Sequence, residues 1–374
     1  MESPIPKPPG TPALDIDTPS LVLDLDAFEH NLSVAHAWFV GQGSRLRPQV
    51  HVHKTPEIAR RQLAVAGAAQ GVAVVSVGEA EVFADAGISD IFLSYPLVTE
   101  SKIARACALA KRARLTLTVE TADAVQRLSR AAASAGVVVD VAVDVQTAPD
   151  RPGVAPGNAA VVLARQAAVS PSLRFAGFSS AGSPLVNGDI EALRFRDWTA
   201  VQVLADTSRM AEGAGLDVPG LSFGDSANIY DVIGKADGIT EVRTGIYPFL
   251  DGNTNGNTLP YGPSLKCSVR VLATVSSRPE PGRAILDAGQ KSVAKDFGLP
   301  TVDGREDLTV VGMNAEHTTV DSSTGGAVDL RIGEKVWLIP ADVSTAFALH
   351  DVVYAVRGGV VEDVWEIAAR GMFA

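Results

Sequence analysis

The sequence predicts an α/β protein: a TIM-like (β/α)8 barrel followed by a C-terminal antiparallel β domain. Apolar segments of strand length alternate with Ala-rich segments of helical periodicity over most of the first 260 residues. This alternation is typical of a parallel sheet with crossover helices, and the number of units favours a closed barrel over an open sheet. Beyond it, β-rich segments follow one another without intervening helices, as in an antiparallel sheet.

The elements are expected in the following order. A proline-rich leader, whose prolines remove backbone donors, occupies residues 1–19. A short strand, 20–24, precedes a helix that begins at Ala27 with Asp26 as its N-cap. Barrel strands are expected at 72–77, 91–94, 115–119, 137–145, 175–179 and 221–223, helices at 57–68, 78–86, 100–112 and 122–133, and β-domain strands at 268–275, 283–287, 308–313, 335–339 and 352–356. The domain limits are then 1–19, 20–262 and 263–374.

Composition excludes several classes of protein. The chain has 43 acidic and 32 basic residues and a formal net charge of −11, which argues against binding to nucleic acid or to an anionic membrane surface. Two cysteines, Cys107 and Cys267, cannot build a disulfide framework. The start of the chain lacks the apolar core of a signal peptide, and no apolar run has the roughly 20 residues of a membrane span. We therefore expect a cytoplasmic protein.

The first candidate site follows an early barrel strand, because reactive groups of such barrels lie at the carboxyl ends of the strands. The segment RPQVHVHK, residues 47–54, contains two histidines at alternate positions. If it is extended, His51 and His53 point to the same side. Two imidazoles on one face can bind a metal ion or exchange protons. Alternatively, they are hydrogen-bonded histidines in a polar barrel mouth.

Two further candidates follow later strands. Residues 144–153 form a polar segment in which Arg151 either pairs with Asp144 or Asp150 or faces a ligand. Glycine-containing turns occur at Gly224 and at Gly245. Turns after late barrel strands commonly hold phosphate on backbone N–H groups, although most such turns have no ligand.

Together these segments resemble one family. The stretches DTPSLVLDLDAFEHNL, HKTPEIARRQL, TEVRTGIYPFLD and VWEIAARG are similar to those of the D-threonine aldolase and D-serine dehydratase group of pyridoxal-phosphate enzymes, which share the alanine-racemase-like barrel. The resemblance implies this barrel and a β domain, which the strand at the end of the leader (1–19) joins. It further implies a homodimer whose active sites are shared between chains. It also implies that Arg151 lies near the cofactor ring. The cofactor-binding residues that it implies are Gly224, Ser226, Arg243, Gly245 and Ile246.

The chain departs from this family at the residue that binds the cofactor covalently. The family segment is close to RPHxKTHK, and its first lysine forms the Schiff base. His51 stands at that position here, and an imidazole cannot form a Schiff base because a primary amine is required. Lys54 matches the second lysine of the family segment and, three residues from His51, should point to the other face.

Two other departures concern the metal ion and the phosphate. The family motif Pro-Asn-His-x-Cys, or His-x-Asp, reads Pro-Ala-Asp-Val-Ser here, with Asp342 and Ser344 at the ligand positions. These oxygen groups favour a hard ion, weakly, or none. In the phosphate turn, the carboxylate of Asp225 would repel a phosphate dianion.

Three hypotheses follow. The first is a lyase-like enzyme for a small amino-acid-like substrate that works without lysine-bound pyridoxal phosphate, with Asp342 supplied by the partner chain. Its acid–base groups are His51, His53, Arg151, Asp225 and Asp342, or a divalent metal ion binds to His51, His53 and Asp342. The second is a pyridoxal-phosphate aldolase or dehydratase that binds its cofactor noncovalently. The third is a non-catalytic protein that binds a small molecule.

Overall fold

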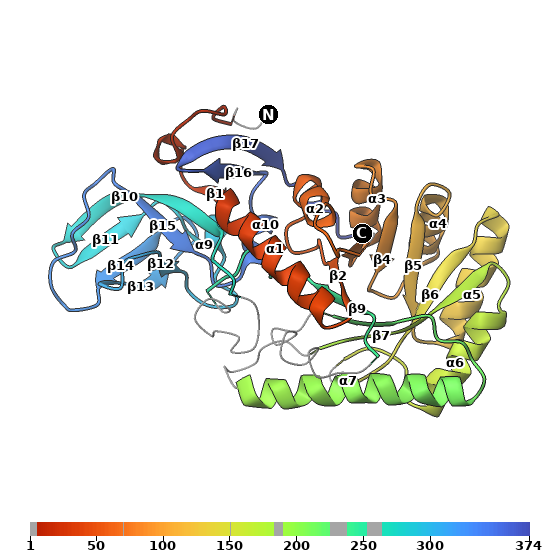
Figure 1. Ribbon diagram of the computed structural model, residues 1–374. Helices are drawn as coiled ribbons and strands as arrows, with labels where there is room; N and C mark the ends of the chain where they lie inside the picture. The colour runs from red at the N-terminus through yellow and green to blue at the C-terminus, as the bar shows by residue number, and fades with distance from the viewer. Residues whose placement is uncertain (1–5, 70, 150, 183–189, 225–237, 253–263) are drawn as a thin grey trace.

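The computed structural model describes residues 6–69, 71–149, 151–182, 190–224, 238–252 and 264–374. These residues form an eight-stranded parallel sheet with helices and a separate nine-stranded mixed sheet (Figure 1). The predicted fold class is confirmed, except that the second sheet is mixed and not purely antiparallel. Among the described residues, no helix is long and apolar enough to cross a membrane.

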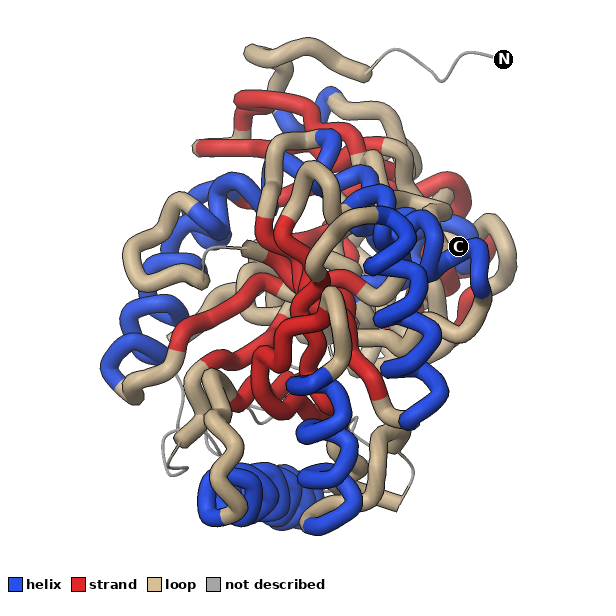
Figure 2. Tube along the Cα trace, turned by 90° about the vertical axis from the view of Figure 1, so that its right-hand side faces the viewer, coloured by secondary structure: helices blue, strands red, loops and turns tan. Residues whose placement is uncertain are grey.

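The parallel sheet has the strand order β2-β9-β8-β7-β6-β5-β4-β3. Gln49 bridges to Ala73, and the Val50 N–H donates to the Ala73 carbonyl over 2.9 Å, so the two ends of this order meet beyond β2 and β3. Figure 2 shows the strands at the centre and helices around them. The strands are β2 (Arg45–Pro48), β3 (Val72–Val74), β4 (Asp90–Leu93), β5 (Arg114–Val119), β6 (Val139–Asp144), β7 (Leu173–Ala181), β8 (Leu221–Gly224) and β9 (Glu241–Thr244).

Several helices of this half begin at polar caps or at proline. Ser76, Thr99 and Thr121 each accept a backbone N–H with the side chain, and Pro56 starts α2. The side-chain oxygen of a capping residue accepts a free N–H group of the first helical turn, and proline has no N–H group that needs an acceptor. The helices are α1 (Leu25–Gly41), α2 (Pro56–Leu63), α3 (Val77–Asp85), α4 (Glu100–Leu109), α5 (Ala122–Ala135), α6 (Asn158–Val169) and α7 (Ile190–Gly213).

The mixed sheet has the order β13-β14-β11-β10-β1-β16-β17, and β15 pairs with β10 and β12. It contains strands at 301–302 and 318–322 that the sequence pattern did not indicate. The strands are β10 (Val269–Glu280), β11 (Arg283–Leu286), β12 (Thr301–Val302), β13 (Leu308–Met313), β14 (Thr318–Ser322), β15 (Lys335–Ile339), β16 (Val352–Arg357) and β17 (Val360–Glu366). Two short helices, α9 (Gln290–Val293) and α10 (Val343–Ala348), complete this half.

The N-terminal strand β1 (Ser20–Asp24) belongs to the mixed sheet. It pairs antiparallel with β10 and parallel with β16. The expectation that the barrel begins at residue 20 is therefore wrong for this strand. The helix after it also starts earlier than expected: α1 begins at Leu25, and its N-cap is Asp24, whose carboxylate accepts the Ala27 N–H over 3.0 Å.

Candidate active site at the barrel mouth

The histidine segment is not an extended strand. β2 ends at Pro48, residues 50–53 form a turn, and the Lys54 N–H donates to the Val50 carbonyl over 2.8 Å. A turn removes the alternation of side chains that a strand imposes. The expectation that His51 and His53 share one face is therefore wrong, and the two rings lie in different surroundings.

His53 is a core residue. Its side chain is fully buried, with Nε2 3.1 Å from Gln62 Oε1 and Nδ1 accepting the Thr55 N–H over 3.1 Å. Phe83, Phe249 and Phe347 surround the ring at 5.9–6.4 Å between centroids. Burial lowers its pKa to about 3, so the ring is neutral at physiological pH. With both nitrogens engaged, His53 is neither an acid–base group nor a metal ligand, which corrects both predicted roles.

A chain of buried polar groups holds His53 in place. Gln62 Nε2 donates to the Tyr247 hydroxyl over 3.0 Å, and this hydroxyl lies 2.9 Å from His36 Nε2. The Gln62 amide thus presents its oxygen to His53, which fixes the Nε2–H tautomer of that ring. The network ties α1 and α2 to the segment after β9 and serves the fold.

His51 has a different environment. Its side chain is half-buried, and its Nδ1 is buried without a hydrogen-bond partner among the described residues. A buried polar atom without a partner costs free energy. Such an atom in a barrel mouth is a candidate to exchange a proton or to bind a ligand.

Lys54 is folded back onto the same turn. Its φ is +56°, a left-handed conformation that is uncommon outside glycine. Its Nζ donates to the His51 carbonyl oxygen. Burial lowers the pKa of this ammonium, while the carboxylates of Glu79 and Asp342 act in the opposite direction. The amine is therefore committed to the backbone of the turn.

Asp342 is the N-cap of α10. Its Oδ1 accepts the Thr345 N–H over 2.7 Å and the Ser344 hydroxyl over 2.6 Å. Its charge acts on Lys54 of its own chain, and its supply to the site of a partner chain stays a prediction. Among the described residues, no group of three His, Cys, Asp or Glu side chains could hold a metal ion. The described part of a single chain therefore does not bring His51, His53 and Asp342 together as a metal site.

Asp144 and Arg151 lie at the end of β6. The Ser179 hydroxyl donates to Asp144 Oδ1 over 2.7 Å. Burial raises the pKa of Asp144 to about 6, although Ser179, Arg243 and Arg151 favour its ionised form. Arg151 Nε is buried without a hydrogen-bond partner among the described residues. The sequence pattern suggested Asp144 only as a partner for Arg151, because burial at a strand end is not visible in the pattern.

The predicted phosphate turns are in part described. Arg243 is 3% exposed, donates to the Ser180 carbonyl over 2.6 Å and lies 4.6 Å from the centre of the Phe92 ring. A Cβ on Gly224 would lie 2.9 Å from Arg243 Cβ, and one on Gly245 2.5 Å from the Gln49 carbonyl. The Ile246 carbonyl accepts the Phe249 N–H over 2.9 Å. Asp225 and Ser226 lie outside the described residues.

The fit to pyridoxal phosphate is incomplete. No primary amine stands at position 51, and the Lys54 amine is engaged by the His51 carbonyl. The two glycine turns are packed against Arg243 and against the turn at 49–52. The described mouth therefore provides no covalent attachment for this cofactor at position 51.

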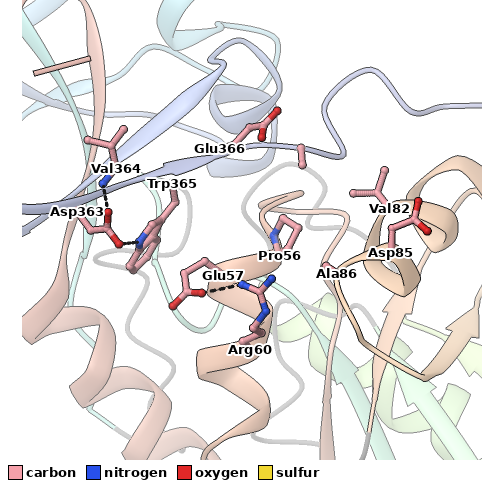
Figure 3. Close-up of a pocket in the computed structure, with 11 residues that line it drawn as sticks. Pro56, Glu57, Arg60, Val82, Asp85, Ala86, Asp363, Val364, Trp365 and Glu366 are labelled. Carbon is pink, nitrogen blue, oxygen red and sulfur yellow. Dashed lines mark hydrogen bonds and ion pairs between the residues drawn. The ribbon is translucent and has the colours of Figure 1, made fainter. Parts of the chain in front are cut away.

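A separate surface pocket of about 470 Å3 lies between α2, α3 and β17 (Figure 3). Arg60 pairs with Glu57 there, and Trp365 Nε1 donates to Asp363 over 2.8 Å. None of the predicted site residues lines this pocket. We therefore assign the candidate site to the barrel mouth.

Comparison with known proteins agrees with this geometry. The family model for the alanine racemase N-terminal domain matches residues 23–251, and a serine dehydratase domain model matches residues 268–356. D-threonine aldolase of Arthrobacter sp. is 37% identical, over 98% of this chain and 96% of its own length. The chain belongs to the D-threonine aldolase and D-serine dehydratase-like family.

Solved structures of this family share the whole fold. The crystal structure of D-threonine aldolase from Filomicrobium marinum has a TM-score of 0.92 and 33% identity and covers 100% of both chains. A metal-free mutant form of D-threo-3-hydroxyaspartate dehydratase has a TM-score of 0.82 and 26% identity, over 95% of this chain and 98% of that chain. These relatives are an aldolase and a dehydratase, which are both lyases.

Proposed function

We propose that the chain is a lyase-class enzyme that acts on a small β-hydroxy amino-acid-like molecule without lysine-bound pyridoxal phosphate. One observation carries this proposal. His51 stands where the family resemblance expects the Schiff-base lysine, and the lysine of the same turn, Lys54, donates to the His51 carbonyl. The substrate class is taken from the relatives, whose names specify D-threonine and 3-hydroxyaspartate.

The remaining groups of the mouth suit proton transfer next to a hydroxyl. In an aldol cleavage, neutral His51 takes the hydroxyl proton, the Cα–Cβ bond breaks, and the electron pair left on Cα takes a proton from protonated Asp144. In a dehydration, ionised Asp144 takes the Cα proton, and protonated His51 donates to the departing hydroxyl, which leaves as water. Asp144, whose pKa is about 6, is a second group that can hold a proton near neutral pH. Arg151, with its unpartnered Nε, supplies positive charge for a substrate carboxylate.

A second candidate is a lyase that binds pyridoxal phosphate without a covalent bond to the chain. The retained glycines 224 and 245 and the cation of Arg151 favour it, because turns and arginines bind phosphate and carboxylate groups. The cofactor would supply an electron-accepting ring when bound. In this case colour would appear only when cofactor is added and would be lost on gel filtration.

The test combines an absorption spectrum with turnover of β-hydroxy-D-amino acids. We expect the purified protein to be colourless, and His51→Ala to reduce turnover by about 10²–10⁴-fold. His317→Ala is the matched control, because His317 is exposed in the β domain. A yellow protein that borohydride bleaches and that stays yellow after gel filtration would contradict the proposal. Binding of a small molecule without turnover of any tested substrate would instead support the non-catalytic hypothesis.

The homodimer with shared sites stays a prediction. Light scattering of the purified protein would measure its mass, and a monomer at micromolar concentration would contradict the prediction.

A further inference from the structure

We propose that Asp342 operates beside an internal cation, the Lys54 ammonium, in place of a divalent metal ion. The inference concerns the cofactor requirement of this chain and does not depend on turnover. It rests on the hydrogen bonds of Asp342, on the charges around Lys54 and on the donor chemistry of the two.

The first step is that Asp342 is already engaged. Its Oδ1 accepts from the Thr345 N–H, the Ser344 hydroxyl and the Thr345 hydroxyl over 2.7, 2.6 and 3.0 Å. An N-cap carboxylate of this kind satisfies the free N–H groups of the first turn of α10. A metal ion would have to compete with these donors for the same oxygen.

The second step concerns Ser344, at the position where the family resemblance expects a cysteine or aspartate ligand. Its hydroxyl proton points to Asp342. A neutral hydroxyl is a poor substitute for a thiolate or carboxylate, so Asp342 is left as one charged ligand. Structural zinc sites have four ligands and catalytic ones three, with sulfur and nitrogen preferred.

The third step is that a positive charge is already present. Lys54 is 6% exposed, and both Asp342 and Glu79 act on its ammonium. Glu79 is 2% exposed, and its Oε2 also accepts the Val75 N–H over 3.0 Å. A divalent ion beside these carboxylates would meet repulsion from the ammonium in a medium less polarisable than water.

The internal cation also has a structural role. Lys54 Nζ donates to the His51 carbonyl, and the Lys54 carbonyl accepts the Ala369 N–H over 3.0 Å. Lys54 is thus a positioning residue that links the turn carrying His51 to the C-terminal half of the chain. The charge that orders this part of the mouth comes from the protein itself.

The experiment measures metal ions directly in the unmodified protein. Elemental analysis of purified protein should find far less than one divalent ion per chain. Titration with Mn²⁺, followed by electron paramagnetic resonance, should show no saturable site, and EDTA should leave the midpoint of thermal unfolding unchanged. A stoichiometric ion that is retained on dialysis and lost in Asp342→Asn would overturn the proposal.

A reciprocal variant tests the role of the ammonium. Lys54→Met leaves Glu79 and Asp342 without their cation, so its affinity for Mn²⁺ should rise by about tenfold or more. Lys291→Met is the matched control, since Lys291 also pairs with a glutamate, Glu316, but at the exposed surface. Equal affinities in the wild type and in a folded Lys54→Met would contradict the proposal. If this variant does not fold, the metal content of the wild type and of Asp342→Asn still tests the proposal.

Discussion

Asp144 lies at the carboxyl end of β6, where burial makes its ionised form unfavourable. Its pKa of about 6 is above the ordinary value of 3.8, so the folded chain binds a proton more tightly than the unfolded chain. The ionised carboxylate therefore lowers the stability above pH 6, and this loss disappears as the pH falls toward 4. The charges of Arg243 and Arg151 act on this carboxyl, and perturbed carboxyls are typical of sites that transfer protons.

Asp144→Asn should raise the free energy of unfolding at pH 7.5, by up to about 3 kcal/mol. The amide keeps an acceptor for the Ser179 hydroxyl and removes the buried charge. The gain should shrink toward zero at pH 4.5, where wild-type Asp144 is protonated in the folded state. Urea unfolding at the two pH values measures both quantities.

The control lies on the same strand. Asp140 accepts hydrogen bonds from Arg114 and Arg174 over 2.8 and 2.6 Å, so Asp140→Asn should lose stability at pH 7.5. If both variants lose stability alike at pH 7.5, the proposed burial penalty on Asp144 is wrong.

At the scale of elements, helix starts depend on details that sequence patterns describe only approximately. Both Asp24 and Asp26 precede the apolar face of α1, and either is an acceptable N-cap residue. In the structure Asp24 caps the helix, while Asp26 lies in its first turn and pairs with Arg357 at the surface. Because α1 begins at Leu25 and not at Ala27, the Leu25 side chain lies in the core.

The two aspartates make a matched pair of variants. Asp24→Ala should lower the free energy of unfolding by about 1 kcal/mol, with a range of 0.5–2, because the Ala27 N–H loses its acceptor. Asp26→Ala removes only a surface ion pair and should cost about 0–1 kcal/mol. Chemical unfolding measures both values, and a larger loss for Asp26→Ala would mean that the assigned cap is wrong.

The sequence predicted for most segments whether they form a helix or a strand, but it did not predict which strands pair with one another. Periodicity located six of the eight barrel strands and the first helices because apolar residues must alternate or recur at fixed intervals to be buried on one face. The strand at 318–322 is short and carries three hydroxyl side chains, so it has little apolar pattern. His51 and His53 looked equivalent, because the turn at 50–53 is set by hydrogen bonds that periodicity does not encode. Asp144 became a candidate for proton transfer only once its burial was known.

At the scale of the whole molecule, the two ends of the chain are joined in one sheet. Leu21 pairs with Val271 of β10, and Leu23 pairs with Ala355 of β16. Leu21 and Leu23 are fully buried in the main core. The N-terminal strand therefore lies at the centre of the mixed sheet. Along the sequence, the barrel separates this strand from its partners β10 and β16.

Removal of residues 1–24 should destabilise the β domain more than the barrel. β10 and β16 would each lose a ladder of backbone hydrogen bonds and expose an unpaired edge, which promotes association. We expect a lower midpoint of thermal unfolding, by circular dichroism, and aggregates on gel filtration. Removal of residues 1–9 is the control, since this part precedes β1 and should leave the midpoint nearly unchanged. A soluble deletion of residues 1–24 with the wild-type midpoint would contradict the assigned role of β1.

This placement of β1 has a consequence for synthesis on the ribosome. Ser20–Asp24 emerges before the whole barrel, and its partner β16 at Val352–Arg357 emerges after it. At 5–20 residues per second, the interval between them is on the order of tens of seconds. The strands of the barrel pair with one another without β1, so the barrel can be complete while an apolar strand is still unpaired. β1 is thus made before the barrel but completes its strand pairing after it. In the meantime the nascent chain must keep β1 from pairing with other chains.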